Sequence, residues 1–583
     1  MSKNVPEDVP VTGNIDTPTE YATRRPPEAA ATGRRRWPAI WIWCAGGLAA
    51  LALWAAYVRL SQSFPTNSDG AGNALQAWQM LHGNPLLRGW VLSDVSFYTT
   101  ELPQYMLVEL ATGLNGNVVH VAAGMTYALA LVAAAALATG RARGWAAVIG
   151  ACIAAGIMLD PQGGDGIVVL LSSPDHIGTS VPIMLAWLIL DRTRPGWAAV
   201  AAASLVLGLA GVADSLVTYA AVVPLVLVVV IRLGHALLTD RSMPRRGILG
   251  ERRYEIGLAV GAVVATIAAR AALRLIAALG GFSSPAPVSS VASIHHILTH
   301  NLPVVGHGLL MLFGADFLDY PVGAVLVLHL VSVLVVVVAV AVTAWHFLAE
   351  PDLVAQLLLA GIVVNLAVFI VSTNVSWLPT MREVDVVLPF SAALAGRQLG
   401  PRLAGALARP AQPARLPGRA SGLSRSAAAI VVVALGLVGA GYAAGLVRQL
   451  TRPISVSSEQ QLANWLAARH LDNGLAGYWQ STVVTLESQG NVRVRMVNID
   501  YGTDPQKLVK FVREDWAGWY NPATNTANFV VTAPGTDSLP GFDGGAAAIA
   551  TFGRPTSTYH FDGYTIMVWP HANLLTELPS PGR

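Results

Sequence analysis

The chain has 583 residues, of which 54% are hydrophobic and 12% are charged, and its mean hydropathy is +0.52. Soluble globular proteins carry about 25% charged residues, so this chain has too little charged surface for a soluble fold. The formal net charge is +3, and no basic surface studded with aromatic residues indicates nucleic-acid binding. Apolar runs of about 18 or more residues recur, and each predicts a transmembrane helix. The composition therefore predicts a polytopic α-helical membrane protein.

The N-terminal part of the chain sets the predicted orientation. Residues 1–36 are rich in Pro, Thr, Glu and Arg, which predicts a disordered arm. The apolar run from Trp37 to Leu60 is too long for a signal-peptide core and lacks a clear cleavage site, so we interpret it as a retained anchor. Lys and Arg in short loops mark the cytoplasmic side. Because "TGRRRW" precedes the anchor, we expect a cytoplasmic N-terminus and an extracytoplasmic segment over residues 61–116.

The later spans follow from hydropathy and from the basic loops between them. The loops "RAR", "DRTR", "RLGHALLTDRSMPRRGILGERR" and "GRQLGPRLAGALARPAQPARLPGRASGLSR" are all basic. All four fall on the cytoplasmic side of one alternating path with about eleven transmembrane helices. After the anchor, spans are expected at residues 118–139, 145–159, 177–190, in a hairpin over 197–233 that turns at Asp214, and at 256–278, 322–345, 353–371, 384–395 and 427–446.

The chain after the last span differs in kind. "NVRVRMVNI", "TANFVVT" and "YTIMVW" alternate in polarity between turn residues, which predicts strands. "SSEQQLANWLAARH" predicts a helix with Ser457 or Ser458 as its N-cap. We therefore expect three parts: a disordered cytoplasmic arm over residues 1–36, a transmembrane domain over 37–447, and a soluble extracytoplasmic α+β domain over 448–583.

The stretch "SFPTNSDGAGNALQAWQMLHGN", residues 63–84, follows the anchor directly. Its apolar residues recur at helical spacing on one face, which predicts an amphipathic helix at the membrane interface. Asp69 and Ser68 stand where the N-cap of that helix is expected, and a cap contributes about 1 kcal/mol. Capping therefore explains an aspartate at this position, and catalysis is the alternative explanation.

The same extracytoplasmic segment carries two further acids, Asp94 and Glu101, among aromatic residues that include Tyr98. A carboxylate can accept a hydroxyl proton, and an aromatic ring can cover the apolar face of a sugar. This combination suits the binding of a hydroxylated group just outside a membrane. The alternative is an interfacial aromatic belt with solvated acids.

Together these features resemble the GT-C glycosyltransferases: a cytoplasmic N-terminus, an acid shortly after the first span, an interfacial helix, a second acid in the same segment and a soluble C-terminal domain. The resemblance implies an integral-membrane enzyme that uses polyprenyl-phosphate sugars. It also implies that the first acid, Asp69, is the general base. Gly70 follows Asp69 where the family commonly has paired acids, so Asp94 and Glu101 are alternative bases.

Two later segments offer groups for substrate binding. "LLSSPDHIGTSVP" places His176, preceded by Asp175, at the start of a span, and "TMREVDVVLPF" places Arg382 and Glu383 at the start of another. A guanidinium can hold a phosphate with two parallel hydrogen bonds, so Arg382 is a candidate for the donor phosphate. The alternative is an ion pair between Arg382 and Glu383 or Asp385.

Four histidines, His295, His296, His300 and His307, lie in "SIHHILTHNLPVVGHG". None has the spacing of a known zinc site, although His296 and His300 could share a helix face. We therefore assign no metal ligand and no certain cofactor, and we leave open a divalent metal.

The function predicted is transfer of a hexosyl or pentosyl unit from a polyprenyl-phosphate donor to an extracytoplasmic glycan, lipid or protein of the cell envelope. The protein is expected in the plasma membrane among membrane lipids, without nucleic-acid partners. One alternative is a transporter or lipid flippase, for which mid-span charges are scarce apart from Arg270 and Arg274, and no internal repeat supports it. Another is a sensor or scaffold that acts through its C-terminal domain.

Overall fold

The computed structural model describes residues 37–162, 165–174, 176–239, 244–285, 289–408, 424–533 and 541–580. The predicted arm, residues 1–36, lies outside the described residues. By internal contacts the chain divides into two units, residues 1–49 and 50–583. In the first unit, residues 37–49 form the start of a helix. The other helices and all the strands of the described residues belong to the second unit.

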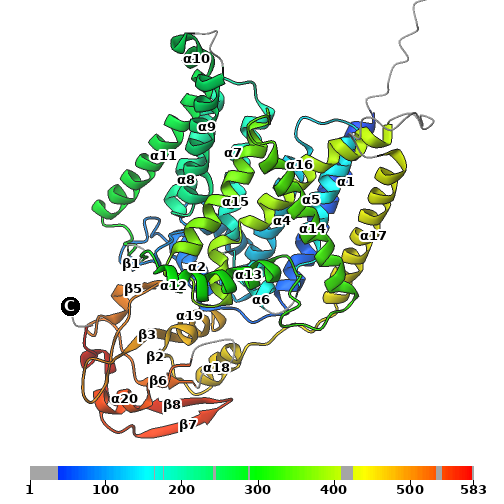
Figure 1. Cartoon of the computed structure of the whole chain (residues 1–583). Coiled ribbons are helices and arrows are strands. Elements are labelled where there is room, and N and C mark those ends of the chain that lie inside the picture. The colour runs from blue at the N-terminus through cyan, green and yellow to red at the C-terminus, as the bar shows by residue number, and fades with distance from the viewer. Residues whose placement is uncertain are drawn as a thin grey trace, which may run out of the picture. The chain divides into compact units, whose positions relative to one another are not determined.

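Each of the eleven predicted spans is helical in the structure (Figure 1). Among the described residues, seven helices are long and apolar enough to cross a membrane, and two further apolar helices, α5 and α8, are shorter. The polytopic helical class is thus confirmed. The eleven are α1 (Trp37–Ser61), α4 (Asn117–Thr139), α5 (Trp145–Leu159), α7 (Ile177–Arg192), α8 (Trp197–Ala213), η1 (Thr218–Val222) continued by α9 (Val223–Thr239), α11 (Arg253–Ala278), α14 (Ala324–Trp345), α15 (Leu353–Val371), α16 (Val387–Ala408) and α17 (Arg425–Gln449).

Helix α16 is the most buried of these helices over its first half, where every residue from Val387 to Gln398 is buried. Arg397 Nη2 lies 2.6 Å from Asp191 Oδ1 at the end of α7 and 2.9 Å from Asp352 Oδ1, the N-cap of α15. Breaking a buried ion pair by removing one partner costs about 3–5 kcal/mol. This cluster therefore fixes three helices to one another.

Shorter elements join the spans. Helix α2 (Ser68–Leu81), strand β1 (Trp90–Val91) and helix α3 (Glu101–Thr112) lie between α1 and α4. Helix α2 and helices α12 and α13 lie at the end of the spans that faces the C-terminal sheet (Figure 1). The other short elements are α6 (Asp165–Leu171), α10 (Arg245–Glu251), α12 (Ile294–His296), η2 (Ile297–Asn301), α13 (Leu302–Leu312) and η3 (Leu378–Val384).

The C-terminal region, residues 448–583, contains a mixed sheet in the strand order β4-β3-β2-β6-β8-β7. Strand β2 pairs in parallel with β3 and β6, and the other pairs are antiparallel. The three predicted strands are β3, β6 and β8, and Ser457 caps the predicted helix α18. The elements are α18 (Ser458–Ala467), β2 (Asn473–Ala476), α19 (Tyr478–Glu487), β3 (Arg493–Asp500), β4 (Lys507–Lys510), β5 (Asp515–Trp516), η4 (Ala517–Tyr520), β6 (Phe529–Thr532), α20 (Gly545–Phe552), β7 (Ser557–Phe561), β8 (Tyr564–Val568) and η5 (Leu574–Thr576).

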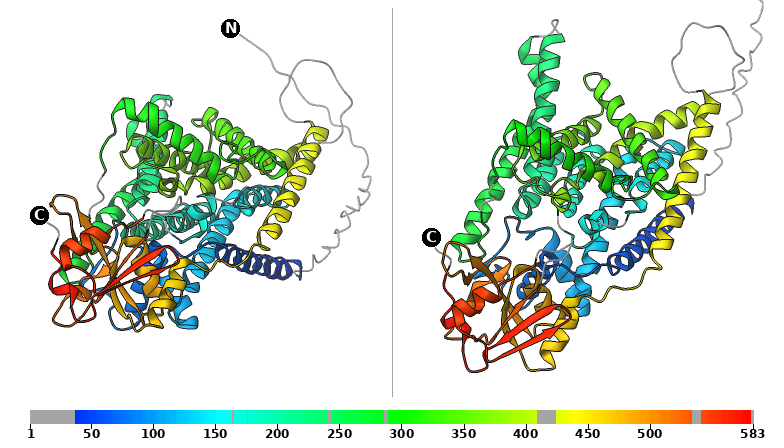
Figure 2. Two further views of the ribbon diagram at one scale, coloured as in Figure 1. Left: turned by 90° about the horizontal axis from the view of Figure 1, so that it is seen from below. Right: turned by 60° about the horizontal axis from the view of Figure 1, so that its bottom comes forward.

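The C-terminal region packs against the segment between α1 and α4 (Figures 1 and 2). Strands β1 and β5 pair, with Trp90 opposite Trp516. The Ser68 hydroxyl of α2 donates to the Tyr478 carbonyl at 2.8 Å, and the Thr482 hydroxyl donates to the Ser68 carbonyl at 3.2 Å. Both parts also share one buried apolar core, which contains Leu75, Trp90 and Leu475. The structure thus brings the start of α19 and the start of β5 next to α2.

Candidate active site

A cavity lies where α2, α7 and β5 begin, next to the end of η3 and to residues 93–97. Most of its lining is charged or polar, and five separate parts of the chain contribute to it. Five of the seven predicted site residues line it, and the other two do not. The lining residues are Asp69, Asn73, Ser93, Asp94, Val95, Phe97, His176, Arg382, Glu383, Arg513 and Glu514.

Asp69 does not cap its helix. The N-cap of α2 is Asn67, whose side-chain oxygen accepts a hydrogen bond from the Gly70 amide at 2.8 Å. The capping interpretation of Asp69 and Ser68 is therefore wrong: the helix begins one residue earlier than the pattern suggested, because an asparagine caps as well as an aspartate. The Asp69 carboxylate is left for other partners.

Both oxygens of the Asp69 carboxylate accept hydrogen bonds. Arg382 Nη1 donates to Oδ2 at 2.7 Å, and the Tyr478 hydroxyl donates to Oδ1. Burial alone would raise the pKa of Asp69, but the Arg382 cation and the hydrogen bond from Tyr478 outweigh burial and hold the pKa below its usual value. Asp69 is thus ionised at neutral pH, as a proton acceptor must be.

His176 is the second charged centre of the cavity. Its Nδ1 lies 3.1 Å from Asp214 Oδ2, and its Nε2 lies 3.6 Å from Glu383 Oε1. Burial lowers the pKa of His176, but Glu383 and Asp214 outweigh burial and raise it to about 10. Burial alone would raise the pKa of Asp214, but the contact with His176 outweighs burial and lowers the pKa below its usual value. His176 is therefore a cation at neutral pH.

The C-terminal region supplies the third cation, Arg513. Its Nη2 lies 3.5 Å from Asp94 Oδ1, and its Nε lies 3.8 Å from Glu514 Oε1. The cavity lining thus contains two guanidiniums and an imidazolium, facing four carboxylates. Such a cavity can bind a ligand that has both hydroxyl groups and a negative charge.

Glu101 and Tyr98 lie outside the cavity lining. Glu101 is fully buried, and a Cβ added at Gly178 would collide with its carboxylate, so it packs against the first turn of α7. The Tyr98 hydroxyl donates to the Pro85 carbonyl at 2.8 Å, and its ring packs on Phe282. Asp175, which precedes His176, lies outside the described residues.

The histidines of residues 295–307 do not reach this cavity. The rings of His296 and His300 stack on each other at 4.7 Å. Among the described residues, one group of potential metal ligands is formed, by His307, Asp316 and Asp319, whose ligand atoms lie within 4.8 Å of one another. None of the three lines the cavity around Asp69.

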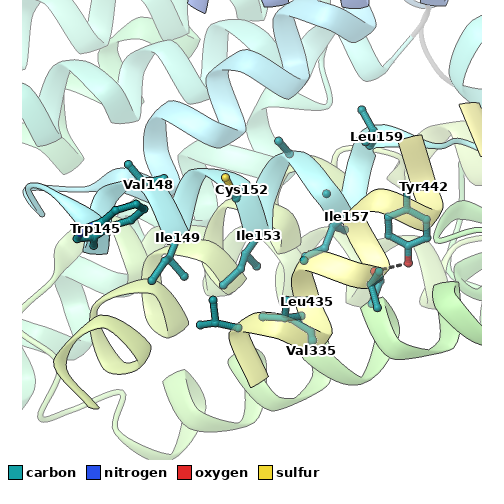
Figure 3. A pocket seen from close by; sticks show the side chains of 17 residues that line it. Trp145, Val148, Ile149, Cys152, Ile153, Ile157, Leu159, Val335, Leu435 and Tyr442 are labelled. Atoms are coloured by element: carbon teal, nitrogen blue, oxygen red, sulfur yellow. Dashed lines mark hydrogen bonds between the residues drawn. The ribbon is translucent and has the colours of Figure 1, made fainter. Parts of the chain in front are cut away.

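A larger groove adjoins the cavity and shares Asp94, Val95 and Glu383 with it. Helices α8, α11 and α15 line the groove, which has about 1550 Å³ of empty volume and includes Arg270 of α11. A separate groove between α5, α14 and α17 is apolar apart from the hydroxyls of Ser332 and Tyr442, which bond to each other at 2.6 Å (Figure 3). Among the residues that line that groove there is no Asp, Glu, His, Lys or Arg.

The chain matches solved structures but no family model and no curated protein. It resembles ArnT from Cupriavidus metallidurans bound to undecaprenyl phosphate, with a TM-score of 0.52 and 14% identity over 95% of this chain and 100% of that chain. For apo ArnT the TM-score is 0.50 and the identity is 14%, over 94% of this chain and 100% of that chain. A third match is the oligosaccharyltransferase AglB from Archaeoglobus fulgidus, in complex with an inhibitory peptide and a dolichol-phosphate. Its TM-score is 0.42 and its identity is 11%, over 84% of this chain and 70% of that chain. The chain has the GT-C fold.

Within this GT-C fold, the absence of a second acid after Asp69 has a steric reason. A Cβ at Gly70 would lie 2.5 Å from Val119 Cγ1, and a Cβ at Gly72 would lie 2.9 Å from Glu514 Oε2. The helix therefore has no room for a neighbouring carboxylate. Glu514 and Asp94 instead bring carboxylates into the cavity from other parts of the chain.

Sequence patterns did not single out Asp214, Tyr478, Arg513 and Glu514 as site residues. Asp214 was noted only as the turn of a hairpin. "FVREDWAGWY" does contain an unusual charged run between aromatic residues, which was a usable signal for Arg513 and Glu514. Nothing in "GYWQST" distinguishes Tyr478 from a core residue.

Proposed function

We propose that this protein is a membrane glycosyltransferase that moves a hexosyl or pentosyl unit from a polyprenyl-phosphate donor to a hydroxyl group of an extracytoplasmic acceptor. The observation that carries the proposal is the environment of Asp69: an ionised carboxylate in a charged cavity that also contains Arg382, His176 and Arg513. The GT-C fold supports the same activity. The acceptor class is a glycan, lipid or protein of the cell envelope.

The proposed reaction is an in-line displacement. Asp69 accepts the proton of the acceptor hydroxyl, and the acceptor oxygen attacks the anomeric carbon of the donor sugar. The bond between that carbon and the phosphate oxygen breaks, and polyprenyl phosphate leaves with the electron pair. Arg382 and protonated His176 offset the charge that develops on the leaving phosphate.

The groove beside the cavity suits the lipid donor. ArnT was solved with undecaprenyl phosphate, and a polyprenyl phosphate needs an apolar channel that ends at a cation. Leu207, Val368 and Phe369 provide apolar walls, and Arg270 provides a cation eight residues before the end of α11. An arginine at membrane depth is costly unless it is paired or hydrated, and a phosphate is a suitable partner.

Arg270 and Arg274 offer a matched pair of substitutions for testing this donor site. Both are exposed arginines on α11, one helical turn apart, but only Arg270 lines the groove. We expect Arg270→Ala to weaken undecaprenyl phosphate binding about ten- to a hundred-fold, as for the loss of a charge-assisted hydrogen bond. Arg274→Ala should bind as the wild type does. Equal affinity in the two variants would exclude this groove as the donor site.

Transfer itself is tested with the purified full chain, a panel of undecaprenyl-phosphate hexoses and pentoses, and octyl glycosides as acceptors. We expect the wild type to form product with one class of donor. Specific binding of undecaprenyl phosphate without transfer from any donor of the panel would favour a lipid transporter instead. The orientation and the domain boundaries, with a cytoplasmic arm over 1–36, a transmembrane domain over 37–447 and an extracytoplasmic domain over 448–583, are part of the proposal.

A further inference from the structure

We propose that Tyr478 is a specificity-determining residue that occupies the place of the acceptor hydroxyl at Asp69 and keeps water from that place until the acceptor displaces it. This inference rests on the proposed function. Tyr478 belongs to the C-terminal region, whereas Asp69 lies on α2.

The contacts of the phenol support this role. Its hydroxyl donates to Asp69 Oδ1 and lies 2.8 Å from Glu514 Oε2. A hydroxyl that donates to Asp69 Oδ1 is the geometry that a general base needs with its acceptor. Arg382 holds the other oxygen, Oδ2. An acceptor hydroxyl that approaches Oδ1 therefore competes with the phenol for this oxygen.

The Tyr478 phenol binds Asp69 through a hydrogen bond and does not transfer its proton to it. A phenol carries one proton, so it can donate to Asp69 or to Glu514 at any one time but not to both. Burial and the two carboxylates raise the pKa of Tyr478 well above its usual value. The hydroxyl therefore stays protonated. If it donates to Glu514 instead of Asp69, Asp69 Oδ1 becomes available and the hydroxyl keeps a hydrogen-bond partner.

Contacts with α2 hold the backbone of Tyr478 in place. The Ser68 hydroxyl donates to the Tyr478 carbonyl at 2.8 Å, and the Thr482 hydroxyl donates to the Ser68 carbonyl. Val483 and Leu486 of α19 are buried in one cluster with alanines of α2. Lifting α19 from α2 would break all these contacts, so rotation of the phenol is the lower-cost displacement.

Exclusion of water is the functional consequence. Water is a hydroxyl nucleophile, and a water at Oδ1 would hydrolyse the donor before an acceptor arrives. A bound phenol fills that place but cannot easily attack, because α19 holds its backbone. A sugar hydroxyl brings additional binding energy from the rest of the acceptor, which allows it to displace the phenol where water does not.

The test compares Tyr478→Phe with Tyr564→Phe. Tyr564 is the matched control because its buried hydroxyl also donates to a carboxylate, Glu459, at 2.7 Å, and Glu459, unlike Asp69, does not line the cavity. In the full chain, with undecaprenyl-phosphate sugars and no acceptor, we expect Tyr478→Phe to raise donor hydrolysis by at least about threefold, the effect of losing part of one hydrogen bond. With octyl glycosides, KM for the acceptor should fall while kcat changes less.

A second measurement does not require activity. We expect carbodiimide and glycine ethyl ester to label Asp69 faster in Tyr478→Phe than in the wild type or in Tyr564→Phe, as followed by mass spectrometry. Unchanged hydrolysis, with a lower kcat and unchanged labelling, would overturn the proposal and make Tyr478 a purely structural residue. If the wild type transfers no sugar but the labelling still rises, the phenol shields Asp69 and it is the proposed function that fails.

Discussion

Asp69 and Arg382 form an ion pair in which 2.7 Å separates Oδ2 from Nη1. The sequence offered two interpretations of Arg382, a phosphate ligand or an ion pair with Glu383 or Asp385. In the structure Arg382 forms an ion pair with Asp69, and the Arg382 side chain is 37% exposed. Because the guanidinium has five donors, pairing with Asp69 does not prevent it from also holding a phosphate in the cavity. Arg382 therefore links the proposed base to the proposed leaving group.

The first prediction concerns Arg382→Ala and Arg382→Lys. We expect alanine to weaken binding of the polyprenyl-phosphate sugar by about ten- to a hundred-fold and lysine to restore only part of this affinity, because an ammonium lacks the planar fork. Loss of the cation also raises the pKa of Asp69, so the acidic limb of the pH–rate profile should move to higher pH. The interpretation of Arg382 as a phosphate ligand would be wrong if both variants bound the donor as tightly as the wild type and the acidic limb of their pH–rate profiles did not move.

Glu101 provides the second prediction. Burial raises the pKa of Glu101 to about 8, whereas an unfolded chain has about 4.3. The folded chain keeps a proton that the unfolded chain loses, so the free energy of unfolding falls as the pH rises from about 4 to 8. Glu101→Gln should lose less thermal stability over that range than the wild type.

Glu101→Gln also tests the base assignment. Glu101 does not line the cavity, so its neutral amide should leave transfer unchanged while Tm follows the pH as described. Abolished transfer in a stable Glu101→Gln protein would identify Glu101, and not Asp69, as the base.

At the scale of elements, the pairing of β1 with β5 determines how the C-terminal region meets α2. Trp516 Nε1 donates to the Arg88 carbonyl at 3.0 Å, and a Cβ at Gly89 would lie 2.6 Å from that same nitrogen. Gly89 also has a φ of +79°, which favours glycine. The contact therefore needs a residue with no side chain.

The third prediction uses Gly89→Ala with Gly83→Ala as control. Both positions have positive φ, but a Cβ at Gly83 meets nothing within 4 Å. Both variants lose about 1–2 kcal/mol from backbone strain, and only Gly89→Ala should displace Trp516 and with it Arg513 and Glu514. We expect limited proteolysis to cut the C-terminal region faster, and transfer to fall, in Gly89→Ala alone. The same behaviour in both variants would mean that the β1–β5 contact does not position the cavity.

The same elements show what the sequence could predict. Long apolar runs predicted the eleven helical spans, and alternation of polarity predicted three strands of the sheet. Neither pattern could predict β1 and β5, because these strands are two residues long and form only by pairing with each other. Tyr478, Arg513 and Glu514 approach Asp69 for the same reason: tertiary packing, and not local pattern, brings them there.

At the scale of the whole molecule, the basic loops predict which side of the membrane each end faces. The loop before α17 is strongly basic, so it should stay in the cytoplasm and the C-terminal region should lie outside. The fourth prediction is that protease added to intact spheroplasts cuts the C-terminal region, whereas a tag at the N-terminus is protected. Cleavage of the C-terminal region only after lysis would reverse the orientation of the proposed active site.

The most direct test of the central claim is the transfer rate of Asp69→Asn. Asparagine keeps the size of aspartate, and its one amide oxygen can accept a hydrogen bond from either Arg382 or Tyr478, but it cannot take a proton. With undecaprenyl-phosphate sugars and octyl glycosides, we expect transfer to fall by at least about a hundred-fold, the usual range for loss of a general base, while undecaprenyl phosphate binding persists. Transfer at the wild-type rate in a folded Asp69→Asn protein would contradict the assignment of Asp69 and would leave Asp94 as the cavity carboxylate to test.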